Sequence, residues 1–393
     1  MNGHLSRRRF LGRSASSIAA FAASNCVSRL SSAQQRSNAS ASTLAYVGSF
    51  TSEDRGARGE GINVYRIDPV SKDWAHVQLL PDLVNPSFLA LDHERRFLYS
   101  AHGDMDYATA FAIDSTSGRL TLLNRENTGG TNGVHLAVDP SNRYLVVSNY
   151  SSGSMAVFPI NADGSLAPRS DLVELPGSPG PHPTQQTSSH PHQNPFDPEG
   201  RFMLVPDKGL DRVFVFRLDL ENGSLEWADT PSISTEPGAG PRHAEFHPTL
   251  PYAYVLNELD STVGVYGYDS LNGALRRIQL LTTLPDDFSG NNTTAEIFAH
   301  PSGRFLYCSN RGHDSIAAFE VDQASGLLTA VDWTSSGGER PRFFGLDPSA
   351  THLYACNELG HNIVTFAIDS ETGRLTPTGQ VVETGSPVTI VFS

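Results

Sequence analysis

Hydrophobic positions beyond residue 41 come in short runs, and no stretch keeps a 3.6-residue apolar period. Runs such as "FLYS" and "YLVVSN" are bounded by Gly, Asn, Asp and Pro. This pattern is typical of β-strands joined by tight turns. Gly (34 residues) and Pro (25 residues) are plentiful, which suits many turns. We therefore expect an all-β body.

One unit recurs along this body. It begins with a D/H-P-x-G-like turn and an apolar strand, continues through a polar turn and a second strand ending in Asp, and closes with x-G-x-L. The copies begin at Asp92, Asp139, Asp197, His247, His300 and Asp347. The steps of 47, 58, 50, 53 and 47 residues match one four-stranded propeller blade. A further strand, called strand A here, precedes each copy: "NPSFLAL", "GVHLAV", "HPHQNPF", "PRHAEF", "TAEIFA" and "PRFFGL".

The two chain ends carry complementary half-units. "LAYVGSF" and "INVYRID" form a strand B and a strand C with no strand A before them, whereas "PVTIVFS" is a strand A with nothing after it. The sequence thus predicts a seven-bladed β-propeller whose C-terminal strand joins the N-terminal blade. Closing the ring removes free sheet edges. A β-sandwich pair or an open solenoid is the alternative, and it does not account for matching half-units.

Residues 1–41 differ from the body. "SRRRFLGRS" is followed by the apolar run "SASSIAAFAAS", and the segment holds six Arg and no acid. The run is too short for a stable membrane anchor. Ser6, Arg7, Arg8, Phe10 and Leu11 resemble a twin-arginine signal, so we expect use of the twin-arginine export machinery and a periplasmic or extracellular protein. A disordered basic tail is the alternative. The predicted propeller domain spans residues 42–393.

The net charge limits which macromolecules the body can bind, and the positions of the cysteines indicate the state of their thiols. Loss of the six Arg of the signal changes the formal net charge from −14 to −20. A body with this negative charge should repel nucleic acid and anionic membranes. We therefore expect neither as a partner. Cys308 and Cys356 lie one and two residues from a strand end, on opposite faces, and are expected to be buried free thiols.

Polar residues cluster at one end of the predicted blades. Because antiparallel strands reverse at every turn, the loop before strand A and the loop after strand B lie on the same face of the ring. Arg242 and His243 start one strand A, and Glu258 follows the next strand B. Equivalent positions in other blades hold His135, Tyr150, His190, His192, Asp207, Glu296, Arg311, Arg342 and Glu358. These side chains are predicted to share one axial funnel.

Several of these residues also have a purely structural interpretation. His247 and His300 replace Asp at a turn on the opposite face and are expected to cap it. A single inner-strand His can be a hydrogen-bonded core residue, and Glu358 can bond backbone at a blade corner. Arg311 and Arg342 can form inter-blade ion pairs. Taken together, Arg, His and Glu on one rim favour a pocket for a small anionic or oxygen-rich ligand.

The residue types limit the chemistry. Arg can polarise a carbonyl, His can move protons near neutral pH, and Glu can orient the His or act as base. The only lysines are Lys72 and Lys208, which disfavours a Schiff base, and no G-x-S-x-G, Walker or dinucleotide-binding motif occurs. His190, His192 and His243 could bind a metal, but Arg242 and Arg311 would repel a cation. We expect no metal and no cofactor.

The stretches "SHPHQNPFDPEGRFMLVPDKGLDRVFVF", "GPRHAEFHP" and "GRFLYCSNRGHDSI" resemble the seven-bladed propeller lactonases, which include 6-phosphogluconolactonases and 3-carboxy-cis,cis-muconate lactonizing enzymes. The resemblance covers residues 44–393 and implies metal-independent opening or closing of a lactone ring. It places the catalytic residues at His192, Arg242, Glu258 and Arg311. His135, His190, His243, Glu296, Arg342 and Glu358 are then candidates for binding a small anionic or sugar-like lactone.

Three features depart from the family pattern. Lys208 stands where the family commonly has Leu. The Pro-rich insertion "GSPGPHPTQQ" before the His motif is expected to cover or reshape the pocket. The export signal argues against a cytosolic sugar phosphate as substrate. The alternatives to a lactonase are a non-catalytic ligand-binding propeller and a scaffold that uses its rim for protein contacts. The sequence does not define the oligomeric state.

Overall fold

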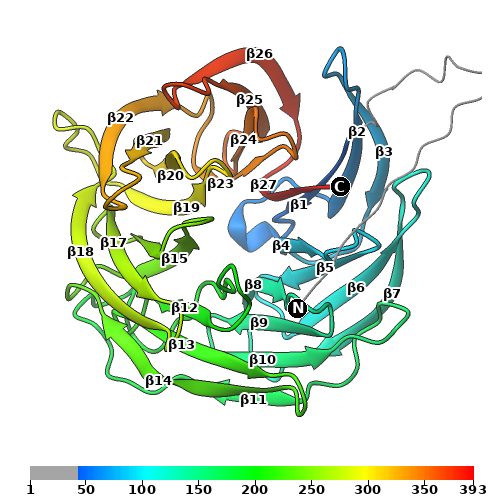
Figure 1. The fold of residues 1–393 in the computed structure, drawn as a ribbon. Helices are drawn as coiled ribbons and strands as arrows, with labels where there is room; N and C mark the ends of the chain where they lie inside the picture. The colour runs from blue at the N-terminus through cyan, green and yellow to red at the C-terminus, as the bar shows by residue number, and fades with distance from the viewer. Residues whose placement is uncertain (1–42) are drawn as a thin grey trace, which may run out of the picture. The chain divides into compact units, whose positions relative to one another are not determined.

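The structure, a computed structural model, describes residues 43–393. The predicted signal, residues 1–41, lies outside the described residues, so its export role stays a prediction. Seven antiparallel sheets stand around one axis (Figure 1). No helix within residues 43–393 has the length and apolar character needed to cross a membrane.

The strands follow the predicted order within each blade, from the axis outward. The first three sheets contain β27 (Pro387–Phe392), β1 (Thr43–Ser49), β2 (Ile62–Ile67) and β3 (Trp74–Leu80); β4 (Pro86–Leu91), β5 (Phe97–His102), β6 (Tyr107–Ile113) and β7 (Leu120–Asn127); and β8 (Gly133–Val138), β9 (Tyr144–Asn149), β10 (Ser154–Pro159) and β11 (Asp171–Glu174).

The remaining four sheets complete the ring. They contain β12 (Met203–Asp207), β13 (Arg212–Asp219) and β14 (Ser224–Ser234); β15 (Pro241–Phe246), β16 (Tyr252–Asn257), β17 (Thr262–Asp269) and β18 (Ala274–Thr282); β19 (Thr293–Ala299), β20 (Phe305–Arg311), β21 (Ser315–Val321) and β22 (Leu328–Ser335); and β23 (Pro341–Leu346), β24 (His352–Asn357), β25 (Asn362–Ile368) and β26 (Leu375–Glu383).

The ring closes as predicted. β27 pairs antiparallel with β1, with Ala45 opposite Phe392 and Gly48 opposite Thr389. The last strand of the chain therefore supplies the inner strand of the first blade, and the seven-bladed, all-β prediction is confirmed. Apolar clusters fill the spaces between neighbouring sheets; one of them packs Leu204 and Val215 against Ala253 and Val255.

One blade differs from the prediction. The segment "HPHQNPF" was expected to be a regular inner strand, but it makes only isolated bridges, Pro191 to Asp207 and Phe196 to Met203. Pro191 and Pro195 have no backbone N–H to donate, which prevents a continuous ladder. In addition, the side chain of Gln193 accepts a hydrogen bond from the Ala244 amide of the next blade. The irregular backbone holds His192 near the axis.

The recurring sequence signals have structural reasons. The Oδ1 atom of Asp92 accepts hydrogen bonds from the amides of Arg96 and Phe97, and so caps the turn between strands A and B. His247 takes the same place, because its Nδ1 accepts from two amides of the turn, as predicted. The x-G-x-L glycine serves the neighbouring blade: Gly118 has φ 76°, and its carbonyl accepts a hydrogen bond from the Tyr46 hydroxyl.

The two cysteines within residues 43–393 are free and buried, as expected. Cys308 packs in the cluster shared with the preceding blade, together with Tyr254 and Leu256. Cys356 packs in the opposite direction, against the first blade. They cannot reach each other, since their side chains leave neighbouring sheets on opposite faces.

Candidate active site

Near their first residues, four inner strands contain a β-bulge that changes the direction of one side chain. In β4, β8, β15 and β23 the pairing register shifts by one residue near the first position. Such a β-bulge leaves one residue unpaired and turns its side chain. The unpaired residues are Ser87, Val134, Arg242 and Arg342. Three of them, all but Arg242, line a cavity at this end of the ring.

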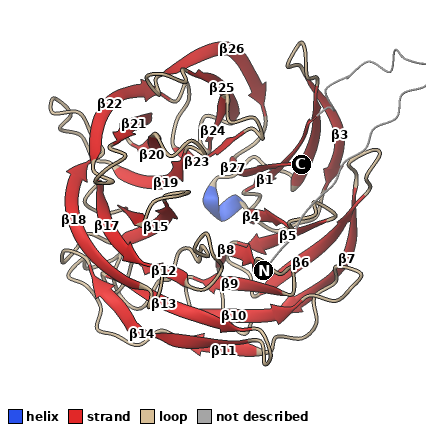
Figure 2. Ribbon diagram, in the orientation of Figure 1, coloured by secondary structure: helices blue, strands red, loops and turns tan. Residues whose placement is uncertain are grey.

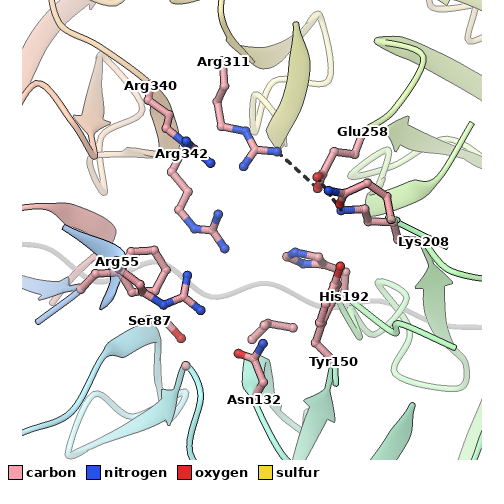
Figure 3. A pocket seen from close by; sticks show the side chains of 14 residues that line it. Arg55, Ser87, Asn132, Tyr150, His192, Lys208, Glu258, Arg311, Arg340 and Arg342 are labelled. Carbon is pink, nitrogen blue, oxygen red and sulfur yellow. Dashed lines mark hydrogen bonds and ion pairs between the residues drawn. The ribbon is translucent and has the colours of Figure 1, made fainter. Parts of the chain in front are cut away.

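The cavity has a volume of about 210 Å³ and lies where the loops before strand A meet the loops after strand B. Its charged side chains are five cations and one carboxylate, Glu258 (Figure 3). The cations are Arg55, Lys208, Arg311, Arg340 and Arg342. Uncharged polar side chains, among them Ser87, Asn132, Tyr150, Gln185 and His192, complete the wall. The charge of the wall favours an anionic or electron-rich ligand.

Glu258 joins three cations near the axis, two from the cavity wall and one, Arg242, that does not line the cavity. It follows β16, and its amide is bonded to the Gly240 carbonyl at 2.8 Å. Its carboxylate lies 2.7 Å from Lys208 Nζ, 3.1 Å from Arg242 Nε and 3.3 Å from Arg311 Nη2. Burial alone would raise the pKa of Glu258, but the three cations, Lys208 first, hold it well below its usual range. The carboxylate of Glu258 is thus ionised and in contact with three cations.

The two catalytic arginines predicted from the resemblance differ in depth. Arg311, the last residue of β20, lines the cavity and donates from Nη2 to the Thr294 carbonyl at 2.6 Å. Arg242 lies behind Glu258, where it donates to the Ala295 carbonyl and is 3% exposed. Burial lowers the pKa of Arg242. Arg311 therefore borders the cavity, whereas Arg242 does not line it and contacts Glu258 instead.

Lys208 is a site residue that the sequence marked only as a departure. Its Nζ donates to Glu258 and also to Gln185 Oε1 at 2.7 Å. Gln185 belongs to the Pro-rich insertion and lines the cavity, as the predicted covering role requires. The neighbouring Gln186 is buried and donates to the Lys208 carbonyl and to Asp211. The insertion is thus bonded to the cavity wall through Lys208.

His192 enters the cavity from the irregular segment (Figure 3). Its amide donates to the Pro206 carbonyl at 2.9 Å, which fixes the backbone. Burial, followed by the charge of Arg242, pushes the pKa of His192 well below its usual value. The imidazole is therefore neutral at pH 7, with one ring nitrogen that carries a lone pair. Its Nδ1 atom is buried and has no hydrogen-bond partner among residues 43–393.

Arg342 is a cation of the cavity wall that could bind a ligand. It projects into the cavity (Figure 3) and makes no hydrogen bond or ion pair with any side chain of the described part of the chain. Its guanidinium lies 5.0 Å from the centre of the Phe50 ring, a cation–π contact that helps to hold it. Burial lowers the pKa of Arg342 to about 10, so it stays charged at neutral pH.

The first blade adds a wall that the sequence analysis missed. The loop from β1 to β2 carries the short helix η1 (Glu53–Arg55), which lies at the centre of the ring (Figure 2). Arg55 packs 4.3 Å from the Phe50 ring centre and pairs with Asp104 at 2.6 Å. The length of "TSEDRGARGEG", far greater than other loops between strands B and C, was the available signal.

The remaining predicted binding residues lie beside or behind the cavity wall. His190 stacks on the ring of Tyr150, with ring centres 4.4 Å apart, and its Nδ1 forms a hydrogen bond with the backbone carbonyl of Tyr150. Glu358 pairs with Arg340, at 3.4 Å. His135 bonds Asn194, and His243 bonds Glu296, each through Nδ1. None of these predicted residues lines the cavity, so a direct ligand contact for them stays a prediction. Residues 43–393 contain no group of three His, Cys, Asp or Glu able to hold a metal ion.

Fold and site together define a seven-bladed propeller with a cationic pocket at one axial end. The model of the family described as "Lactonase, 7-bladed beta-propeller" matches residues 44–392, and the chain belongs to this family. This confirms the resemblance predicted from the stretches that contain the SHPHQ, GPRH and NRG motifs.

Two relatives and one solved structure illustrate the likeness. The 6-phosphogluconolactonase of Bacillus subtilis (strain 168) is 39% identical over 308 residues, which cover 77% of this chain and 85% of that protein. The 6-phosphogluconolactonase of Formosa agariphila is 34% identical, over 77% of this chain and 86% of that protein. The structure of the Pseudomonas aeruginosa periplasmic gluconolactonase superposes with a TM-score of 0.82 at 33% identity, over 90% of this chain and 99% of that chain.

Proposed function

We propose that this protein is a lactone hydrolase that opens a small sugar lactone in the axial cavity. The observation that carries the proposal is the juxtaposition of three side chains in one cavity. They are neutral His192, the cation Arg342, which forms no ion pair within residues 43–393, and the cation Arg311, which Glu258 anchors. A base and preorganised cations are what hydrolysis of an ester-like carbonyl needs. The names of the lactonase relatives support the opening direction.

The reaction follows from these positions. Arg311 polarises the lactone carbonyl, and His192 accepts a proton from the attacking water. A bond forms between the water oxygen and the carbonyl carbon, and negative charge grows on the carbonyl oxygen beside the guanidinium of Arg311. Collapse breaks the bond between that carbon and the ring oxygen. His192 returns its proton to the ring oxygen, and the product is a hydroxy acid.

Glu258 has a supporting role in this scheme. It is an ionised carboxylate that contacts three cations, and no hydrogen bond joins it to His192. We infer that it holds Arg311 and Lys208 in place and that His192 supplies the base. Arg242 then acts from behind Glu258, as a positioning cation.

The cavity also favours a type of lactone. Arg342 is charged and makes no side-chain hydrogen bond or ion pair within residues 43–393, so a substrate that carries an anionic group gains a charge-assisted hydrogen bond there. We infer that the substrate is a sugar lactone with a carboxylate or phosphate substituent. Arg7 and Arg8 of the predicted export signal support a site of action outside the cytoplasm. One structural relative is a periplasmic gluconolactonase.

A lactone panel tests the proposal. The protein of residues 42–393 is assayed by pH-stat with gluconolactone, 6-phosphogluconolactone and carboxylated lactones, after subtraction of spontaneous hydrolysis. We expect turnover, with preference for the anionic members. Arg342→Gln should lower that preference by about 10–100-fold, the value of one charge-assisted hydrogen bond. Absence of turnover across the panel would leave the ligand-binding alternative in place of the hydrolase.

A further inference from the structure

Behind the cavity wall, β15 and β19 bring a second histidine and a carboxyl group together. His243 Nδ1 lies 2.8 Å from Glu296 Oε1, and the two side chains are 2% and 5% exposed. The ring centre of His243 is 5.2 Å from that of His192, with the ring planes at 63°. His243 does not line the cavity, so it is one layer behind the residue that does.

Both histidines have an unused nitrogen in this layer. His192 Nδ1 and His243 Nε2 are buried and have no hydrogen-bond partner among residues 43–393. Burial of an unpaired polar atom is unfavourable, so two such atoms on adjacent rings point to a shared partner. A single ordered water, or a small rotation of either ring, would satisfy both atoms.

The hydrogen bonds of Glu296 indicate which nitrogen of His243 carries the proton. Its Oε1 accepts from the Ile297 amide at 3.1 Å, so this oxygen is an acceptor. His243 must then carry its proton on Nδ1 and present a lone pair at Nε2. Burial raises the pKa of Glu296 to about 8, against the lowering effect of Arg242.

We propose that Glu296 and His243 are positioning residues that fix the tautomer of His192. This inference rests on the proposed hydrolase function. His243 Nδ1–H donates a hydrogen bond to Glu296, and His192 Nδ1–H donates to His243 Nε2, directly or through one water. The lone pair of His192 is then on Nε2, the nitrogen left to accept a proton from water. Neither His243 nor Glu296 touches the substrate in this arrangement.

Kinetics on four variants test the arrangement. His243→Phe keeps the ring and removes both nitrogens, so kcat should fall at least about tenfold, as for loss of other orienting partners, while KM changes little. Glu296→Gln keeps an acceptor oxygen held by the Ile297 amide and should retain most of the kcat at pH 7. Glu296→Met removes the acceptor and should resemble His243→Phe. The control is His247→Asn, a buried histidine at the opposite end of the ring.

A spectroscopic measurement on the unmodified protein tests the arrangement even if the variants fold poorly. ¹⁵N-labelled histidine NMR on the unmodified protein of residues 42–393 reports the tautomer of each ring, and the Nδ1–H form is expected for both His192 and His243. Assignment can use His192→Asn and His243→Asn. An Nε2–H form of His192, or an unchanged kcat in folded His243→Phe, would overturn the inference. These results are distinct from failure of the hydrolase proposal, which would appear as inactive wild-type protein.

Discussion

Replacing Glu258 by Gln removes the one carboxylate that lines the cavity and leaves three cations without their shared partner. The side chains of Lys208, Arg242 and Arg311 are 5%, 3% and 6% exposed, so water can replace only a small part of the lost interaction. Removal of one partner from a buried ion pair costs about 3–5 kcal/mol. For a domain of this size, with an unfolding entropy of about 2 cal/mol/K per residue, that loss lowers Tm by roughly 4–7 °C.

The same prediction has a pH dependence. Because the pKa of Glu258 is lower in the folded protein than in the unfolded chain, its stabilisation is full above the unfolded pKa and declines as the pH falls below it. The difference between wild type and Glu258→Gln should therefore shrink below about pH 4.5, by about 1.4 kcal/mol per pH unit.

Calorimetry at one scan rate, at pH 7 and near pH 3.5, measures both effects. Lys208→Met supplies a matched background, because the loss caused by Glu258→Gln should be smaller when one cation is already absent. If Glu258→Gln leaves Tm within about 1 °C of wild type at pH 7, Glu258 is not the anchor of the three cations, and the reasoning fails.

Three further predictions concern other parts of the chain. Burial raises the pKa of Glu245 to about 8, so the folded protein binds more protons than the unfolded chain and stability should fall from about pH 4.5 to 8; urea titration of Glu245→Gln should show a smaller fall, and an equal fall would contradict it. Deleting residues 387–393 removes β27 and should give insoluble or cooperatively destabilised protein, which an unchanged Tm would refute. Changing Arg7 and Arg8 to Lys should abolish export, measured by cell fractionation; normal export would exclude the twin-arginine route.

The fold could be predicted because each blade repeats its own signals. Asp92 and its equivalents cap the turns between strands A and B, and each x-G-x-L glycine packs under a neighbouring blade, so both recur at the spacing of a blade. Repetition does not reveal where one blade departs from the others. The irregular inner segment at His192 depends on two prolines and on a contact from Gln193 to the next blade, which strand periodicity does not encode.

The site could be predicted only in part. The rule that loops before strand A and after strand B share one face brought Arg242, Glu258 and Arg311 together correctly. The depth of Arg242 could not be predicted, because a β-bulge turns its side chain and Glu258 covers it. Arg55 was missed because its position depends on the path of a long loop rather than on a repeated strand.

The central claim is that His192, in the cationic cavity, supplies the base for lactone opening. The most direct measurement compares kcat/KM of wild type and His192→Asn on the best lactone of the panel, with His76→Asn on the outer strand β3 as control. The account predicts a loss of about 10²–10⁴-fold for His192→Asn, and a control that agrees with wild type within about twofold. A His192→Asn protein that is folded and keeps wild-type kcat/KM would contradict the claim.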